Sequence, residues 1–108
     1  MVSLIQIKRM IQKTEILNKL KMGKSELKKF GVIRIGLFGS LVRNESKSDS
    51  DVDILIDMSL DTENIFDKRF QLKDALMQRF LKNVDVCHER AIKPVFKDLV
   101  FKDAIYAW

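Results

Sequence analysis

Two short apolar runs with a wholly polar segment between them constrain the fold of this 108-residue chain most strongly. Residues 32–38 (VIRIGLF) and residues 51–57 (DVDILID) are rich in β-branched and apolar side chains. Runs of this length that end at turn residues are typical of buried β-strands. Residues 44–50 are all polar, which predicts a surface loop between the two strands. The sequence therefore predicts a buried sheet.

Helical periodicity flanks these strands. Apolar residues recur at roughly helical spacing over residues 3–21, which predicts an amphipathic helix. Ser25 is suited to cap a short second helix that ends just before Gly31. A longer amphipathic helix of about twenty residues is expected from Thr62, with Glu63 in its first turn. The predicted apolar side of that helix consists of Ile65, Phe66, Phe70, Leu76, Met77, Phe80 and Leu81.

A third strand and a final helix complete the expected order of elements. Residues 83–87 form a short alternating run, and Pro94 stands where a last helix would begin. The side chains expected to dock that helix on the core are Val95, Leu99, Ile105 and Trp108. The length allows one modest core, so residues 1–108 are expected to form one small domain. Its predicted class is α+β (mixed α/β), with a mixed sheet of three to four strands and helices packed against it.

The charge balance is compatible with polyanionic partners. Twenty Lys and Arg oppose fifteen Asp and Glu, which gives a formal net charge of +5. Many of the basic residues fall within residues 8–30, but no aromatic residue is interleaved with those lysines to stack on bases. A solvated helical face is therefore favoured, and DNA binding is not expected.

The single cysteine and the hydropathy pattern are typical of a cytoplasmic protein. Cys87 has no partner for an internal disulfide and lies in an apolar run, which predicts a buried thiol. Met1 leads into a helical pattern rather than a signal peptide, and no apolar stretch approaches the roughly 20 residues of a membrane span. A cytoplasmic protein without a membrane partner is expected.

Gly39 and Ser40 follow the first strand at a predicted turn. Glycine lets a backbone approach a phosphate closely, and N–H groups at a turn bind anions. The Ser40 hydroxyl can reach a phosphate oxygen or a metal-bound water. Such pairs also occur in ordinary turns, so this pair alone is a weak indication of phosphate binding.

Asp51 and Asp53 lie at the mouth of the second strand. Residues two apart on a strand point to one face, so both carboxylates project together while Val52 packs on the other side. Their repulsion is relieved by a divalent cation, and Mg²⁺ prefers one or two carboxylates together with substrate phosphates. An exposed strand start is the structural alternative, and the EF-hand calcium spacing is missing.

Asp85 is a third acid, isolated between two valines on the expected third strand. Neighbouring strands lie about 4.8 Å apart, so Asp85 can stand beside Asp51 and Asp53, or face solvent on an edge strand. Three carboxylates beside a phosphate-binding turn suit two-metal phosphoryl or nucleotidyl transfer.

These residues resemble the signature of the DNA polymerase β-type nucleotidyltransferases. The spacing from Gly39-Ser40 to Asp51-Val-Asp53 within GLFGSLVRNESKSDSDVDILID carries the resemblance, which is strongest to the minimal prokaryotic branch, the MNT proteins. The segments KKFGVIRIGLFGS, VDVCHE and KPVFKDLVFKDAIYAW extend it over nearly the whole chain. Asn44 stands where the family commonly has Gly, and Asn tolerates the left-handed conformation.

The resemblance implies a set of site residues and a reaction. Nucleotide binding is implied for Gly39, Ser40 and Arg43, and catalysis with metal binding for Asp51, Asp53 and Asp85. The implied cofactor is Mg²⁺ in a two-metal site, with ATP as the substrate. MNT proteins are commonly encoded beside HEPN-domain toxins. The resemblance thus implies an antitoxin that transfers AMP to a hydroxyl, expected to be a tyrosine, of a cognate HEPN RNase toxin.

Two other functions remain open from the sequence. A nucleotidyltransferase that acts on a small molecule or an RNA end usually carries a further domain for its acceptor, and 108 residues leave little surface for one. A non-catalytic antitoxin would bind and occlude its toxin.

Three further residues invite a functional interpretation. His88 follows Cys87, but no other Cys or His exists in the sequence to complete a metal or nucleophilic site, so a structural role is expected. Tyr106 and Trp108 are expected to dock on the core of the chain itself.

Overall fold

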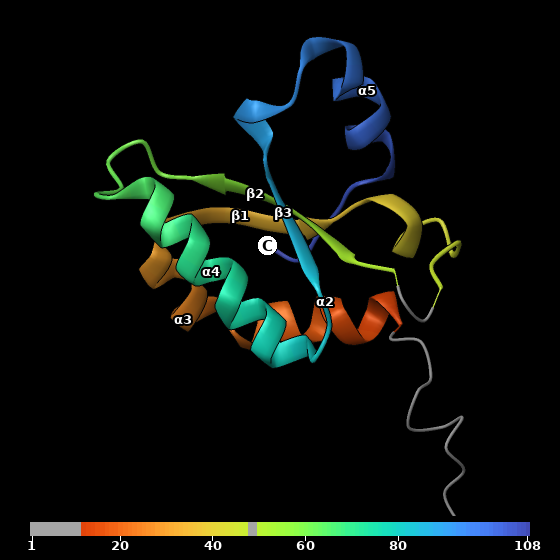
Figure 1. The fold of residues 1–108 in the computed structure, drawn as a ribbon, viewed down its shortest axis with the longest axis horizontal. Coiled ribbons are helices and arrows are strands. Elements are labelled where there is room, and N and C mark those ends of the chain that lie inside the picture. The colour runs from red at the N-terminus through yellow and green to blue at the C-terminus, as the bar shows by residue number, and fades with distance from the viewer. Residues whose placement is uncertain (1–11, 48–49) are drawn as a thin grey trace, which may run out of the picture.

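The computed structural model describes residues 12–47 and 50–108, and its centre is a four-stranded mixed sheet (Figure 1). The strands are β1 (Val32–Leu37), β2 (Val52–Met58), β3 (Val84–His88) and β4 (Ile105–Tyr106). They lie in the order β3-β2-β1-β4, with β1 antiparallel to β2 and β4, and β2 parallel to β3. The three predicted strands and the mixed sheet are confirmed.

Helices cover one face of this sheet. They are α2 (Lys13–Met22), α3 (Lys24–Leu27), which continues into a 3-10 turn at Lys28–Phe30, and α4 (Ile65–Phe80). Figure 1 shows all three on the same side of the strands, whereas α5 (Pro94–Asp103) lies on the other side. The core between helices and sheet contains Ile16, Leu20, Ile35, Leu37, Val52, Ile54, Ile56, Met58, Leu72 and Leu76, all buried.

The first helices agree with the sequence except at one cap. Residues 3–11 of the predicted first helix lie outside the described residues, and α2 covers the remainder. Gly31 ends the second helical segment at φ +90°, as predicted. Ser25 is not a cap, because the chain passes directly from Gly23 into α3 and Ser25 lies inside the helix.

The helix α4 differs from the prediction in its start and in its apolar face. The helix α4 begins at Ile65 and not at Thr62, so Glu63 precedes it, and Asp67 is the acid of its first turn. Its buried residues are Leu72, Leu76 and Phe80, spaced by four. Three residues predicted to lie on the apolar side are exposed because they lie off this buried stripe. They are Phe66, Phe70 and Leu81.

The C-terminal helix does not dock on the core as expected. None of the residues of α5, all of which the structure describes, is buried, and Val95 and Leu99 are 78% and 63% exposed. The C-terminal residues attach instead. Trp108 packs against the core and donates from Nε1 to the Leu20 carbonyl (3.0 Å), which confirms its predicted docking, while Ile105 is exposed in β4.

The strand β4 was not foreseen, because two residues are too short for a periodic signal. It pairs with Gly36 and Leu37 of β1. A Cβ on Gly36 would lie 2.5 Å from the Ile105 carbonyl oxygen, so glycine permits this close approach. Among the described residues, no helix is long and apolar enough to span a bilayer.

Candidate active site

The turn after β1 brings the predicted Gly-Ser pair against an acid of β2. Residues Gly39–Leu41 form a 3-10 turn in which Gly39 has a left-handed φ of +78°. A Cβ on Gly39 would lie 2.4 Å from Oδ2 of Asp53, so only glycine fits between turn and carboxylate. The Phe38 N–H donates to the Asp53 carbonyl oxygen (3.1 Å), which fixes the approach. Gly39, Ser40 and Asp53 therefore occupy one site.

The third acid lies beside the second because β2 and β3 run parallel. Asp53 is the direct register partner of Asp85, and Asp51 precedes β2 by one residue. The buried neighbours Val52 and Ile54 point into the helix-covered core, so Asp53 faces the opposite side of the sheet. From the sequence, Asp85 could lie either at this site or at a solvated sheet edge. The strand register places Asp85 at the site, where its side chain is exposed.

Burial and the neighbouring acids make Asp53 costly to ionise. The pKa of Asp53 is raised from 3.8 to about 6, first by burial and then by the negative charges of Asp85 and Asp51, while Arg43 opposes the shift. A carboxylate held in this way gains from a nearby cation. The electrostatics therefore match a site that accepts positive charge.

The donor set fits a cation that arrives with a nucleotide. Within residues 12–47 and 50–108, no group of three or more His, Cys, Asp or Glu side chains is arranged to hold a metal ion. Mg²⁺ takes one or two carboxylates and completes its coordination with substrate phosphates and water. The crowded charges at Asp53 suit such a partial set of protein ligands, and the assignment of all three acids as ligands stays a prediction.

Arg43 lies beside the turn but already has two partners. Its Nη1 contacts Oδ2 of Asp103 at 2.9 Å, and its Nε contacts Oε2 of Glu45 at 3.1 Å. The ion pair with Asp103 ties the end of α5 to the segment that follows the Gly39–Leu41 turn. Asn44 has a φ of +60°, so the expected left-handed turn is kept. The predicted role of Arg43 in nucleotide binding stays a prediction.

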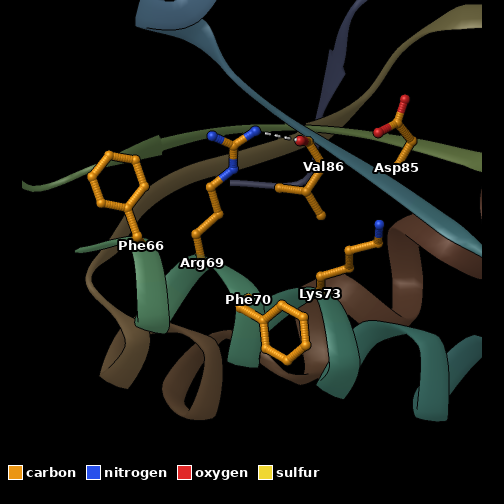
Figure 2. Close-up of a pocket in the computed structure, with 6 residues that line it drawn as sticks. All are labelled: Phe66, Arg69, Phe70, Lys73, Asp85 and Val86. Carbon is orange, nitrogen blue, oxygen red and sulfur yellow. Dashed lines mark hydrogen bonds between the residues drawn. The ribbon is translucent and has the colours of Figure 1, made fainter. Parts of the chain in front are cut away.

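A groove next to the acids was missed by the sequence reasoning. It measures about 310 Å³, lies between α4 and β3, and is lined by Phe66, Arg69, Phe70, Lys73, Asp85 and Val86 (Figure 2). The available signal was a pair of phenylalanines and a pair of basic residues, each four apart on one helix. Such spacing also fits a core-facing stripe, which is why the sequence predicts core positions for the phenylalanines.

His88 is structural, as expected. It is buried, and its Nδ1 and Nε2 lie 3.1 and 3.2 Å from the backbone nitrogens of Arg90 and Met58. Burial lowers the pKa of His88, and a neutral ring is the form that can accept from a backbone N–H. Cys87 is half-buried rather than fully buried, because its side of β3 faces away from α2, α3 and α4.

A second polar cluster holds β4 and β1 to the residues after β3. Glu89, which is 8% exposed, binds Arg34 through two contacts of 3.1 and 2.6 Å and accepts from the Tyr106 hydroxyl at 2.6 Å. The Arg34 guanidinium also lies 4.9 Å from the centroid of the Tyr106 ring. Burial and the Glu89 carboxylate raise the pKa of Tyr106 to about 12.

Replacing Glu89 with Gln is expected to destabilise the chain. The change leaves the Arg34 charge without its partner and weakens the Tyr106 hydrogen bond, which together cost about 2 kcal/mol. Urea unfolding at neutral pH measures this loss, and Asp74→Asn on the exposed side of α4 is the control with little effect. An unchanged midpoint for Glu89→Gln would contradict a stabilising role for the cluster.

The fold and the site together define a minimal nucleotidyltransferase, with a glycine turn facing acids on two adjacent strands. The chain belongs to the polymerase beta nucleotidyltransferase family, whose model matches residues 18–106.

Relatives and solved structures agree with this family. The chain is 36% identical over 98 residues to the protein adenylyltransferase MntA of Thermococcus cleftensis, covering 90% of this chain and 97% of that protein. A solved chain assigned to the minimal nucleotidyltransferases superposes with a TM-score of 0.75 at 26% identity, covering 88% of this chain and 95% of that one. A chain in the complex of the tri-AMPylated Shewanella oneidensis HEPN toxin with MNT antitoxin shares the fold. Its TM-score is 0.60 at 22% identity, over 90% of this chain and 72% of that one.

Proposed function

We propose that this chain transfers AMP from ATP to a tyrosine hydroxyl of a cognate HEPN RNase toxin and so acts as its antitoxin. The observation that carries the proposal is the register of Asp53 with Asp85 beside the Gly39 turn. The family match and the relative named as a protein adenylyltransferase support the class of reaction. We place the reaction in the cytoplasm, where ATP is available, and assign residues 1–108 to one catalytic domain.

Each residue of the site has a proposed role. Backbone N–H groups of Gly39 and Ser40 bind the triphosphate, and Arg43 neutralises part of its charge. Asp51, Asp53 and Asp85 hold Mg²⁺, which, when bound, supplies charge stabilisation at the α-phosphate and at the leaving pyrophosphate. Asp85 accepts the proton of the toxin hydroxyl while the hydroxyl oxygen bonds to the α-phosphorus and the bond to pyrophosphate breaks.

We propose that the acceptor is a separate chain. Asp51 and Asp85 are exposed, so the site is open to a macromolecule. A small-molecule or RNA-end acceptor would need its own binding domain. The AMP adds a negative charge and bulk to the toxin, which opposes RNA binding.

The test uses purified chain, labelled ATP, Mg²⁺ and the protein encoded by the neighbouring gene, which is expected to be the HEPN protein. Label transfer and a mass gain of one AMP on the HEPN protein are expected, and both should vanish in Asp51→Asn/Asp53→Asn. Protection of cells at wild-type level by that double variant would instead establish neutralisation by occlusion.

Nucleotide binding in the presence of Mg²⁺ is expected to weaken as the pH falls through about 6. The ionised form of Asp53 binds the cation, and its pKa is raised to about 6. Below that pH, affinity should fall about tenfold per pH unit, since one proton competes with the cation. Calorimetric titration with Mg²⁺ and a non-hydrolysable ATP analogue from pH 5 to 8 measures this. A flat profile would show that Asp53 does not bind the cation.

A further inference from the structure

The groove between α4 and β3 has properties that the nucleotide site does not use. Phe66 and Phe70 are 82% and 74% exposed, one helical turn apart, and Arg69 and Lys73 stand one turn apart beside them. Solvent-exposed aromatic pairs of this kind mark binding surfaces more often than structural ones. Figure 2 shows Arg69 and Lys73 extending from α4 towards β3, with Asp85 on the far side of that strand.

We propose that this groove binds the acceptor protein, through an acidic segment that carries aromatic side chains and presents the hydroxyl to be adenylylated. The identity of the reaction rests on the function proposed above, but binding in the groove does not depend on it. The occupant is defined by three features: the position of the groove, its charge, and the state of the β3 edge.

Position links the groove to the reaction. Asp85 belongs both to the groove lining and to the acid pair with Asp53. Because β3 is the end strand of the described sheet, only this strand separates the groove from the acid face. A segment seated on Phe66 and Phe70 can therefore pass around the free edge of β3 and bring a hydroxyl to Asp85.

Charge selects an acidic segment. A second hollow of about 250 Å³ continues the groove towards the end of β3, shares Phe66 and Arg69 with it, and adds Arg90. Arg69 and Lys73 thus face the groove against the single acid Asp85, while Arg90 of the second hollow pairs with Asp57 at 3.2 Å. Complementary negative charge on the partner steers association and fixes its orientation.

The edge of β3 favours side-chain docking over strand addition. Arg69 donates from Nη2 to the Val86 carbonyl oxygen at 2.9 Å, so one edge acceptor of β3 already has a partner. A partner strand would have to displace this contact. The exposed phenylalanine rings and Ile65 instead offer apolar surface to the side chains of the bound segment.

The same aromatic and basic side chains are also suited to single-stranded RNA, which is therefore the competing outcome. Asp85 disfavours it, because RNA carries a negative charge on every nucleotide and must place a phosphate near this carboxylate, whereas a protein segment can place a neutral hydroxyl side chain there. The protein segment is the occupant that all the lining residues accommodate.

The test measures binding of a fluorescent random copolymer of glutamate and tyrosine by anisotropy, without ATP. Phe66→Ser/Phe70→Ser and Lys73→Glu should each raise the dissociation constant about tenfold. Val95→Ser/Leu99→Ser on α5 is the matched control, since it removes two exposed apolar side chains one turn apart elsewhere. All these residues are exposed, so circular dichroism should show unchanged melting temperatures.

Three results would overturn the inference. The first is that the wild-type chain binds a lysine–tyrosine copolymer as tightly as the glutamate–tyrosine copolymer. The second is that the α5 control loses as much binding as the groove variants. The third is that an oligouridylate binds more tightly than the acidic copolymer.

AMP transfer to the HEPN protein separates this inference from the proposed function. Transfer with an unchanged KM in Phe66→Ser/Phe70→Ser would reject the groove while the enzyme stands. Absence of transfer, with copolymer binding that still depends on these phenylalanines, would reject the enzyme and leave the groove as a protein-binding site.

Discussion

Replacing Asp53 with Asn is expected to reduce AMP transfer on the order of a thousandfold, because the change removes a charge that neutralises the cation at the transferred phosphate. Asp53 lies closer to the glycine turn than any other acid described at the site, with Oδ2 only 2.4 Å from where a Cβ of Gly39 would stand. Asn keeps the shape of the side chain, so the loss reports on charge. Single-turnover transfer of labelled AMP measures it.

The same variant is expected to be more stable than the wild type without ligand. The pKa of Asp53 in the folded chain, about 6, lies above its unfolded value of 3.8. The favourable contribution of the protonated form is therefore complete below pH 3.8 and is lost as the pH rises through about 6. Asn does not ionise. After discounting for solvent screening of this half-exposed group, Asp53→Asn should gain about 1 kcal/mol at pH 7.5.

Thermal unfolding at pH 4 and at pH 7.5 separates this effect from a general change in packing. The variant and the wild type should coincide at the lower pH and differ at the higher one. Asp57→Asn is the matched control, because Asp57 lies on the same strand and face but pairs with Arg90 at 3.2 Å. This control should keep AMP transfer and gain no stability. Equal transfer by Asp53→Asn and wild type would remove Asp53 from the proposed site.

Replacing Gly39 with Ala is expected to lower AMP transfer about a hundredfold and to cost about 1–2 kcal/mol of stability. The φ of +78° is strained for alanine, and the added methyl group would lie 2.4 Å from Oδ2 of Asp53. Asp53 must rotate away from the turn, which separates the carboxylate from the N–H groups proposed to bind phosphate.

Gly31→Ala provides the matched control for strain. Gly31 has a φ of +90°, and an added Cβ would lie 2.3 Å from the Thr62 hydroxyl oxygen, far along the sheet from the acids. It should lose similar stability in urea unfolding and keep AMP transfer once folded. If both glycine variants lose transfer equally, the effect of Gly39→Ala comes from folding and not from the site.

The local features of the site could be read from the residues in sequence. Gly39 follows a strand of β-branched residues, and Asp51 and Asp53 stand at the mouth of the next one, so alternation predicts that both acids share a face. The left-handed turn at Asn44 was also predictable, because few residues accept that conformation. These properties depend on neighbours along the chain, which is why the sequence can predict them.

The tertiary structure decided which distant residues meet. The parallel register of β2 and β3 places Asp85 opposite Asp53, and no local pattern contains that register. It also decided that the Phe66 and Phe70 face of α4 stays outside the core, and that β4, not α5, attaches the C-terminal residues. Apolar periodicity shows that a helix has an apolar face, but only packing against the sheet selects which face is buried. The sequence by itself determined the turn and the three candidate acids, while the fold supplied the position of the third acid opposite Asp53 and the groove beside it.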